Sequence, residues 1–150
     1  MSIEATDRSR TPPIGVTYHR VDYSEIDQMG VVYHARYLVW LDVARTELLR
    51  DTGVSYRELE EMGLYLVVSA ADLRYRQPAR YDDLVRVRCW VRERASRRIT
   101  FGYAVEHDAT NRLLVTATTS LIVLNHDFSL ARLPDHVAGR LISIPDPVRL

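Results

Sequence analysis

The sequence has no lysine and only one cysteine. All twenty basic residues are arginine, which excludes catalysis through a lysine Schiff base. Cys89 alone cannot form a disulfide within the chain or a multi-cysteine metal site, which is typical of a reducing compartment. No apolar run is long enough to span a membrane, and the polar N-terminal segment lacks the apolar stretch of a signal peptide. We therefore expect a cytoplasmic protein that does not enter a membrane.

The charge is balanced, with twenty acidic and twenty basic residues. No overall field favours nucleic acid or an anionic membrane, so any anion site must be local. A chain of 150 residues is long enough to bury one core and needs no second domain. The predicted organisation is a flexible N-terminal tail at 1–14, one domain at 15–143, and a C-terminal tail at 144–150.

A strand is predicted at 16–23, followed by a loop and a long helix. The helix should begin near Val32 to His34 and run to Gly53. Its apolar residues recur three or four apart and predict one buried stripe, made of Leu38, Leu41, Ala44 and Leu48. A second short helix is expected in "SYRELEEMG", where Ser55 precedes Glu58 at a capping-box spacing and Gly63 ends the segment.

Period-two patterns predict four later strands, at 65–76, 84–94, 98–107 and 112–125. The second of these places Val85, Val87, Cys89 and Val91 on one face and arginines with Trp90 on the other. We expect an α+β domain in which an antiparallel sheet wraps around one long central helix. An open sheet edge and an exposed Trp90 predict an oligomer.

The stretch "YSEIDQMGVVYHARYL" places Asp27 and Gly30 just before the predicted helix. Backbone N–H groups in the first turn of a helix are unpaired and carry partial positive charge, so they can hold an oxyanion. A carboxylate nearby could attack a carbonyl or activate water against it, and a glycine would let the substrate approach. The alternative is that Asp27 only caps the helix or a turn.

This stretch, together with "ARTELLR" and "YRQPARYDDLVRV", resembles the YbgC and 4-hydroxybenzoyl-CoA thioesterase family of hotdog-fold proteins over residues 16 to 127. The resemblance implies an acyl-CoA thioesterase whose subunits pair their sheets edge to edge, as a homodimer or homotetramer with active sites at the interface. It implies Asp27 as nucleophile or general base, with Tyr23 and His34 around it. Gly30, Tyr33 and the backbone N–H of His34 would admit the substrate and polarise its carbonyl.

Other candidates are weaker. Arg97 and Arg98 lie where related thioesterases bind the nucleotide end of coenzyme A, and Arg74, Arg76 and Arg80 are lesser candidates for phosphate contact. Glu47 is expected to pair with a neighbouring arginine, and Cys89 to be buried. No cluster has metal-ligand spacing, and no cofactor is expected beyond the coenzyme A of the substrate. Met29 is a candidate for setting substrate choice.

Two alternatives to an acyl-CoA thioesterase stay open at this point. The protein could hydrolyse thioesters of acyl carrier protein, in which case the rim of the site should meet an acidic helix. It could also bind acyl groups or bridge partners without turnover. The combination of Tyr23, Asp27 and Gly30 favours catalysis, because a scaffold has no physical need for a carboxylate beside a helix N-terminus.

Overall fold

A computed structural model describes residues 13–150. The elements in chain order are β1 (Ile14–Arg20), η1 (Tyr23–Glu25), α1 (Arg36–Asp51), α2 (Tyr56–Glu61), β2 (Leu64–Tyr75), β3 (Leu84–Arg94), β4 (Arg98–His107), β5 (Leu113–Asn125) and α3 (Asp135–Ala138). Most of the predicted N-terminal tail lies outside the described residues. No helix in the described part is long and apolar enough to cross a membrane.

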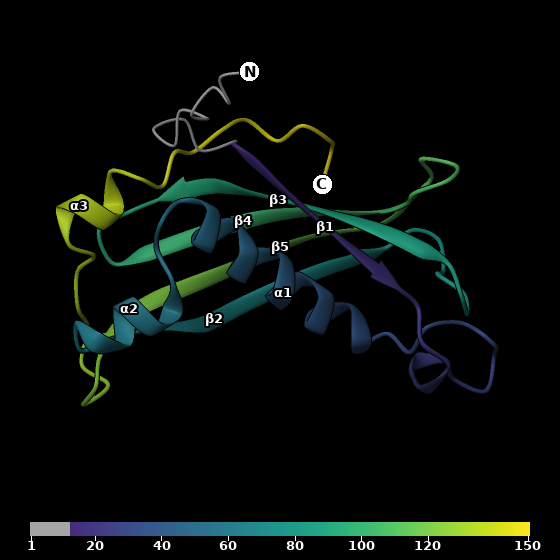
Figure 1. Ribbon diagram of the computed structural model, residues 1–150, viewed down its shortest axis with the longest axis horizontal. Coiled ribbons are helices and arrows are strands. Elements are labelled where there is room, and N and C mark those ends of the chain that lie inside the picture. The colour runs from purple at the N-terminus through teal and green to yellow at the C-terminus, as the bar shows by residue number, and fades with distance from the viewer. Residues whose placement is uncertain (1–12) are drawn as a thin grey trace, which may run out of the picture.

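The five strands form one antiparallel sheet in the order β1-β3-β4-β5-β2, and α1 lies against one face of it (Figure 1). The antiparallel sheet predicted from the sequence is confirmed. Consecutive strands β3, β4 and β5 pair as a meander, because each alternating segment ends at turn-forming residues such as "DATN". β1 and β2 form the two edges.

The core lies between α1 and the inner face of the sheet. Helix residues Tyr37, Leu41, Ala44 and Leu48 are buried, whereas Leu38 is 42% exposed. The prediction that Leu38 belongs to the buried stripe is therefore wrong. Tyr37, four positions before Leu41, takes the inward place on the helix instead. Cys89 is fully buried on the inner face of β3 as predicted, and Glu47 pairs with Arg50.

Glycines end both helices in the predicted way. Gly53 and Gly63 have φ of +82°, the left-handed conformation that commonly follows a helix C-terminus. The Ser55 side chain accepts a hydrogen bond from the backbone N–H of Glu58, which caps α2.

The outer face of the sheet is partly covered by the chain's last residues. Ser143 bridges to Val91, and the Ile144 N–H donates to the Val91 carbonyl at 3.0 Å. Asp146 then accepts a hydrogen bond from the indole N–H of Trp90 at 3.0 Å. Trp90 is fully buried, so the prediction that it is exposed is wrong: the alternating pattern identified its face correctly but could not show that residues 143–146 return to cover it.

Candidate active site

Asp27 lies in a tight loop whose base is closed by a bridge between Ile26 and Val32. The Gly30 N–H donates to the Asp27 carbonyl at 3.0 Å, and Gly30 has φ of +75°, a conformation that side chains disfavour. Oδ1 of Asp27 accepts from the backbone N–H of Met29 at 2.9 Å and of Val31 at 3.4 Å. The aspartate therefore caps its own turn, and this turn fixes the direction of the carboxylate.

One oxygen of the Asp27 carboxylate remains available after this capping. Within residues 13–150, no side chain or backbone group donates a hydrogen bond to Oδ2. The two readings considered from the sequence are thus compatible, because the same side chain can stabilise the turn through Oδ1 and present Oδ2 to a substrate.

The loop is anchored to the rest of the fold by Glu25, which is 8% exposed. Its carboxylate lies 2.7 Å from Nε2 of His19 and accepts from the indole N–H of Trp40 at 2.7 Å. It also accepts from the Asp22 N–H at 2.8 Å, which completes a capping box around η1. The Glu25 carbonyl accepts from the Tyr33 N–H on the far side of the loop. Strand β1, η1 and α1 are thereby tied to both ends of the Asp27 loop.

These contacts set the charge of Glu25. Burial alone would raise its pKa, but the hydrogen bonds from Asp22, His19 and Trp40 outweigh burial and lower the pKa of the carboxyl below its usual value. Glu25 is therefore an ionised carboxylate with good partners, as buried charges require.

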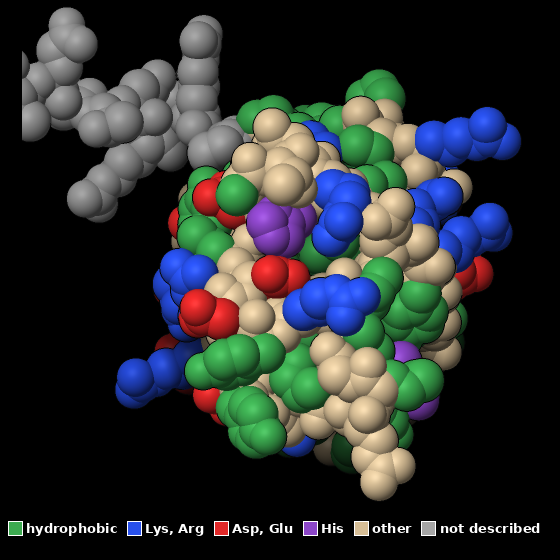
Figure 2. All heavy atoms as spheres, turned by 90° about the vertical axis from the view of Figure 1, so that its right-hand side faces the viewer, with side chains coloured by type: hydrophobic (Ala, Val, Ile, Leu, Met, Phe, Trp, Pro, Cys, Tyr) green, Lys and Arg blue, Asp and Glu red, His purple; other side chains and the backbone are tan. Residues whose placement is uncertain are grey.

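A cavity of about 270 Å³ opens beside Asp27. Its lining comes from the Asp27 loop, the start of α1, the end of β2 and the segment after β2. The lining residues are Asp27, Met29, Val31, Val32, His34, Tyr37, Tyr75, Arg76, Gln77 and Pro78. The Asp27 loop belongs to the end of the molecule that faces the viewer in Figure 2, where acidic, basic and histidine side chains are interspersed with hydrophobic ones. Of the residues singled out from the sequence, the cavity brings together Asp27, Met29, His34 and the lesser candidate Arg76.

The start of α1 is held against β2 by a side chain that the sequence did not identify. Tyr75 donates from its hydroxyl to the His34 carbonyl at 2.9 Å, which fixes the peptide just before the helix. The helix itself begins at Arg36, so the predicted start near Val32 to His34 is wrong by two to four residues. The reason is that the backbone of 32–35 forms tertiary contacts instead, including the bond from the Val32 N–H to the Ala79 carbonyl.

The backbone N–H of His34 has no hydrogen-bond acceptor among the described residues, and the N-cap residue Ala35 provides no side-chain cap. Unpaired donors at a helix start can stabilise an anion. Nearby, burial raises the pKa of Tyr37, and the charges of Tyr75 and Asp27 raise it further. Tyr37 therefore stays protonated beside the carboxylate.

Other predicted site residues lie outside the cavity lining. Tyr23 is 75% exposed and packs edge-on against Tyr81. Gly30 shapes the loop without lining the cavity, and the ring of Tyr33 packs at a tilt against that of His34, with a centroid distance of 4.6 Å. Arg97 and Arg98 lie at the β3–β4 turn, at the end of the sheet opposite to the Asp27 loop.

Comparison with known proteins decides the family. The thioesterase-like superfamily matches residues 21–141. The chain belongs to this superfamily. It is 36% identical over 107 residues to a putative acyl-CoA thioesterase, YneP, of Bacillus subtilis, covering 71% of this chain and 77% of that protein. It is 31% identical to the acyl-CoA thioester hydrolase YbgC of Escherichia coli, covering 71% of this chain and 78% of that protein.

A solved structure agrees with these relatives. The DHNA-CoA thioesterase of Staphylococcus aureus superposes with a TM-score of 0.79 at 30% identity, covering 84% of this chain and 88% of that one. The resemblance to the YbgC and 4-hydroxybenzoyl-CoA thioesterase family, stated from the sequence motifs, is confirmed, and the protein is an enzyme of the thioester hydrolase class.

In this thioesterase fold, sequence reasoning missed the residues that complete the cavity from a distance. Tyr75, Gln77 and Pro78 come from the end of β2 and the segment after it, more than forty residues beyond Asp27. The signal in the sequence was the "YRQPARYDD" stretch, which contributed to the family resemblance and supplied weak arginine candidates but gave no role to Tyr75, Gln77 or Pro78. Among residues 13–150, no group of three or more His, Cys, Asp or Glu side chains is placed to hold a metal ion.

Proposed function

We propose that this protein hydrolyses the thioester of an acyl-CoA to the free acid and coenzyme A, with Asp27 as the nucleophile or general base. The observation that carries the proposal is the position of Asp27, which lines the cavity with Oδ1 held by the loop N–H groups and with no donor to Oδ2 among residues 13–150. No cofactor is required, because water and the coenzyme A ester supply all reacting atoms.

As general base, Asp27 would accept a proton from water while the water oxygen attacks the thioester carbonyl. The N–H of His34 would donate to the carbonyl oxygen as it becomes negative, and a donor of this kind is typically worth ~2.7–4 kcal/mol in transition-state stabilisation. Collapse of the tetrahedral intermediate would break the C–S bond and release the thiolate. Coenzyme A leaves readily because a thiol is a much stronger acid than an alcohol, with a pKa of about 8.5.

As nucleophile, Asp27 would attack the carbonyl itself and form a mixed anhydride with release of the thiolate. Water would then cleave the anhydride and regenerate the carboxylate. The two routes share the same residues. Isotope labelling distinguishes them: after a single turnover in water enriched in ¹⁸O, the anhydride route can place the label in the Asp27 carboxylate, whereas the general-base route places it only in the product acid.

The edge strand β2 supports a homodimer. Its twelve residues pair with β5 on one side, and the residues from Val68 to Asp72 are exposed. A long edge strand is a template for pairing with another strand. A two-fold axis perpendicular to the sheet would pair two copies of β2 antiparallel and keep both α1 helices on one face. A homotetramer would then form from two such dimers.

This dimer gives Arg97 and Arg98 a role that they cannot have within one chain. Antiparallel pairing brings opposite ends of the two sheets side by side, so the arginines of one subunit would lie at the same end as the cavity of the other. From there they could contact the phosphates of the coenzyme A. The active site would then be shared between subunits, in a protein of the cytoplasm.

The test is thiol release from a panel of acyl-CoAs by the wild type, Asp27→Asn and Asp27→Ala. The asparagine keeps an oxygen that can accept from Met29 and Val31, so the turn survives while the charge is lost. We expect kcat to fall by ~10²–10⁴-fold in Asp27→Asn, with no change in Asp51→Asn, an exposed carboxylate at the other end of α1. Activity of Asp27→Asn equal to that of the wild type would refute the mechanism.

The same panel addresses the alternatives. Acyl carrier protein thioesters serve as a parallel set of substrates, and faster turnover on them would replace the coenzyme A proposal. Acyl-CoA binding without thiol release would indicate a binding protein. Light scattering that shows a monomer would contradict the shared site.

A further inference from the structure

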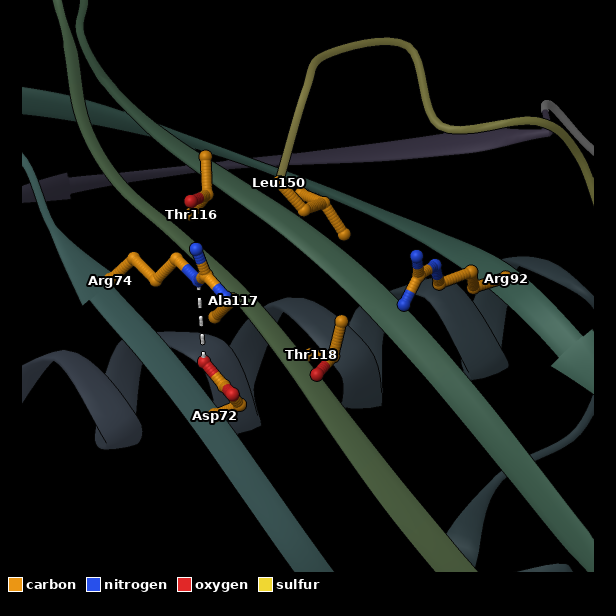
Figure 3. A pocket seen from close by; sticks show the side chains of 7 residues that line it. All are labelled: Asp72, Arg74, Arg92, Thr116, Ala117, Thr118 and Leu150. Carbon is orange, nitrogen blue, oxygen red and sulfur yellow. Dashed lines mark ion pairs between the residues drawn. The ribbon is translucent and has the colours of Figure 1, made fainter.

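The outer face of the sheet, opposite α1, carries a second hollow of about 150 Å³. Figure 3 shows it with α1 behind the sheet and with Arg74 and Arg92 entering from opposite sides. The two arginines come from β2 and β3, while Thr116 and Thr118 on β5 lie between them. The hollow and the Asp27 cavity share no lining residue.

The hollow exists because the middle of this face is made of small residues. The strand register aligns Trp90, Gly102, Thr118 and Asp72 in one row across the sheet. Gly102 has no side chain, and three atoms of the Trp90 ring lie close to the place that a Cβ at residue 102 would occupy. The long side chains of the neighbouring rows can therefore reach over the gap.

Hydrogen-bond donors dominate this hollow. The ion pair of Arg74 is with Asp72, at 3.9 Å between Nε and Oδ1, and both side chains are about two-thirds exposed, so the pair contributes little. Arg92 uses Nε to donate to Asp146 at 3.1 Å, and within residues 13–150 its two Nη groups donate to no other atom. Both guanidinium groups therefore retain free N–H groups.

Thr116 adds a donor whose direction is set by its surroundings. The side chain of Arg76 donates to Oγ1 of Thr116 from both Nε and Nη2, at 3.3 and 3.1 Å. Because these bonds occupy the oxygen as an acceptor, the Thr116 hydroxyl hydrogen remains to be donated. Arg74 and Arg92 line the hollow against one carboxylate, Asp72, and the remaining lining residues are Thr116, Ala117, Thr118 and Leu150. Arg76 belongs to the lining of the Asp27 cavity and meets the hollow through its bonds to Thr116.

We propose that this hollow binds a phosphate group. Arginine forks and hydroxyl donors match the several acceptor oxygens and the negative charge of a phosphate better than those of any neutral ligand. Two arginines on opposite sides suit an ester or diphosphate that presents oxygens in both directions. The phosphate could belong to coenzyme A or to a separate small molecule, and these two sources share the same recognition chemistry.

The test is calorimetric titration of the intact protein, without acyl-CoA, with inorganic phosphate, pyrophosphate and adenosine 3′,5′-bisphosphate at constant ionic strength. We expect binding of at least one probe, weakened by about tenfold or more in Arg74→Gln and in Arg92→Gln, because each removes a charge-assisted contact. Arg57→Gln is the matched control, since Arg57 is an exposed arginine on α2 that pairs with Glu61 and does not line the hollow. Its affinity should equal that of the wild type.

A second pair of variants tests the hydroxyl donor. Thr116→Val should weaken the same probe, while Thr116→Ser, which keeps the hydroxyl, should retain it. The proposal is overturned if no probe binds, or if Arg74→Gln and Arg92→Gln bind the probes as well as Arg57→Gln does.

Kinetics then identify the source of the phosphate. If coenzyme A supplies it, Arg74→Gln raises KM for acyl-CoA and leaves a pantetheine thioester unaffected. If a separate ligand supplies it, KM for acyl-CoA is unchanged while the calorimetric effect persists. Because the titrations contain no thioester, they can fail or succeed independently of the proposed hydrolysis.

Discussion

Replacement of Gly102 by alanine should destabilise the protein through a single steric contact. A Cβ at this position would lie 2.5 Å from Cε2 and Nε1 of Trp90 and 2.7 Å from Cζ2, distances at which atoms overlap. Trp90 is fully buried, so its ring cannot move aside freely. Either the ring leaves the sheet face or the strands shift.

The magnitude follows from two contributions. Overpacking of a well-packed site typically costs about 1–3 kcal/mol. Displacement of the indole would also break its bond to the Asp146 carboxylate, and hydrogen bonds to charged groups contribute about 1.5–3 kcal/mol. We expect Gly102→Ala to lower the free energy of unfolding by about 2.5–6 kcal/mol, the sum of the two contributions, measured by urea denaturation followed by circular dichroism.

A double-mutant cycle isolates the contact. Trp90→Leu removes the three ring atoms that approach residue 102, so Gly102→Ala should cost about 0.5 kcal/mol or less in that background, near the limit of additivity. Alanine could even stabilise it there, since glycine inside a strand is unfavourable by roughly 0.5–1 kcal/mol. Equal costs of Gly102→Ala in both backgrounds would show that the ring does not lie over Gly102.

Three further predictions test other parts of the structure. Glu25→Gln should lower the free energy of unfolding by about 1–3 kcal/mol near neutral pH, as expected for weakened bonds to a buried charge. The folded-state pKa of Glu25 is lowered, so its charge stabilises the fold above the unfolded pKa of about 4.3, and this contribution is lost as pH falls through the folded pKa. Denaturation curves of wild type and variant should therefore converge in acid. A stability difference that does not depend on pH would contradict the ionised state of Glu25. Cys89 should resist a thiol-reactive dye at pH 8 until the protein is unfolded, because burial raises the pKa of its thiol; rapid labelling of the native protein would show that β3 opens readily. Gly30→Ala should cost about 1 kcal/mol from its left-handed backbone without a steric clash, and a melting temperature unchanged from the wild type would mean that the loop adopts another conformation.

The strands were predictable because their signals are local. Alternation in 84–94 and 98–107 matches β3 and β4 residue for residue, since the side-chain period of a strand follows directly from its backbone geometry. Gly53 and Gly63 likewise ended their helices where expected. These features depend on neighbours in the sequence and need no knowledge of what packs against them.

The first turn of α1 and the cover over Trp90 were not predictable in this way. Both depend on segments distant in the sequence: the Ala79 carbonyl pairs with Val32, and Asp146 reaches Trp90 from 56 positions away. A periodic pattern contains no information about which remote segment will offer a hydrogen-bond partner.

The residues of the candidate site likewise include some that the sequence could predict and some that it could not. The sequence by itself determined the family, the aspartate and the glycine that lets its loop turn, because these lie within one short motif whose spacing is fixed by the backbone. The tertiary structure decided that Tyr23 lies outside the cavity lining, that Tyr75 and Pro78 complete the cavity, and that Glu25 anchors the Asp27 loop through His19 and Trp40. Those roles arise only when β1, α1 and the end of β2 meet, since a side chain can line a cavity only where separate elements leave space between them.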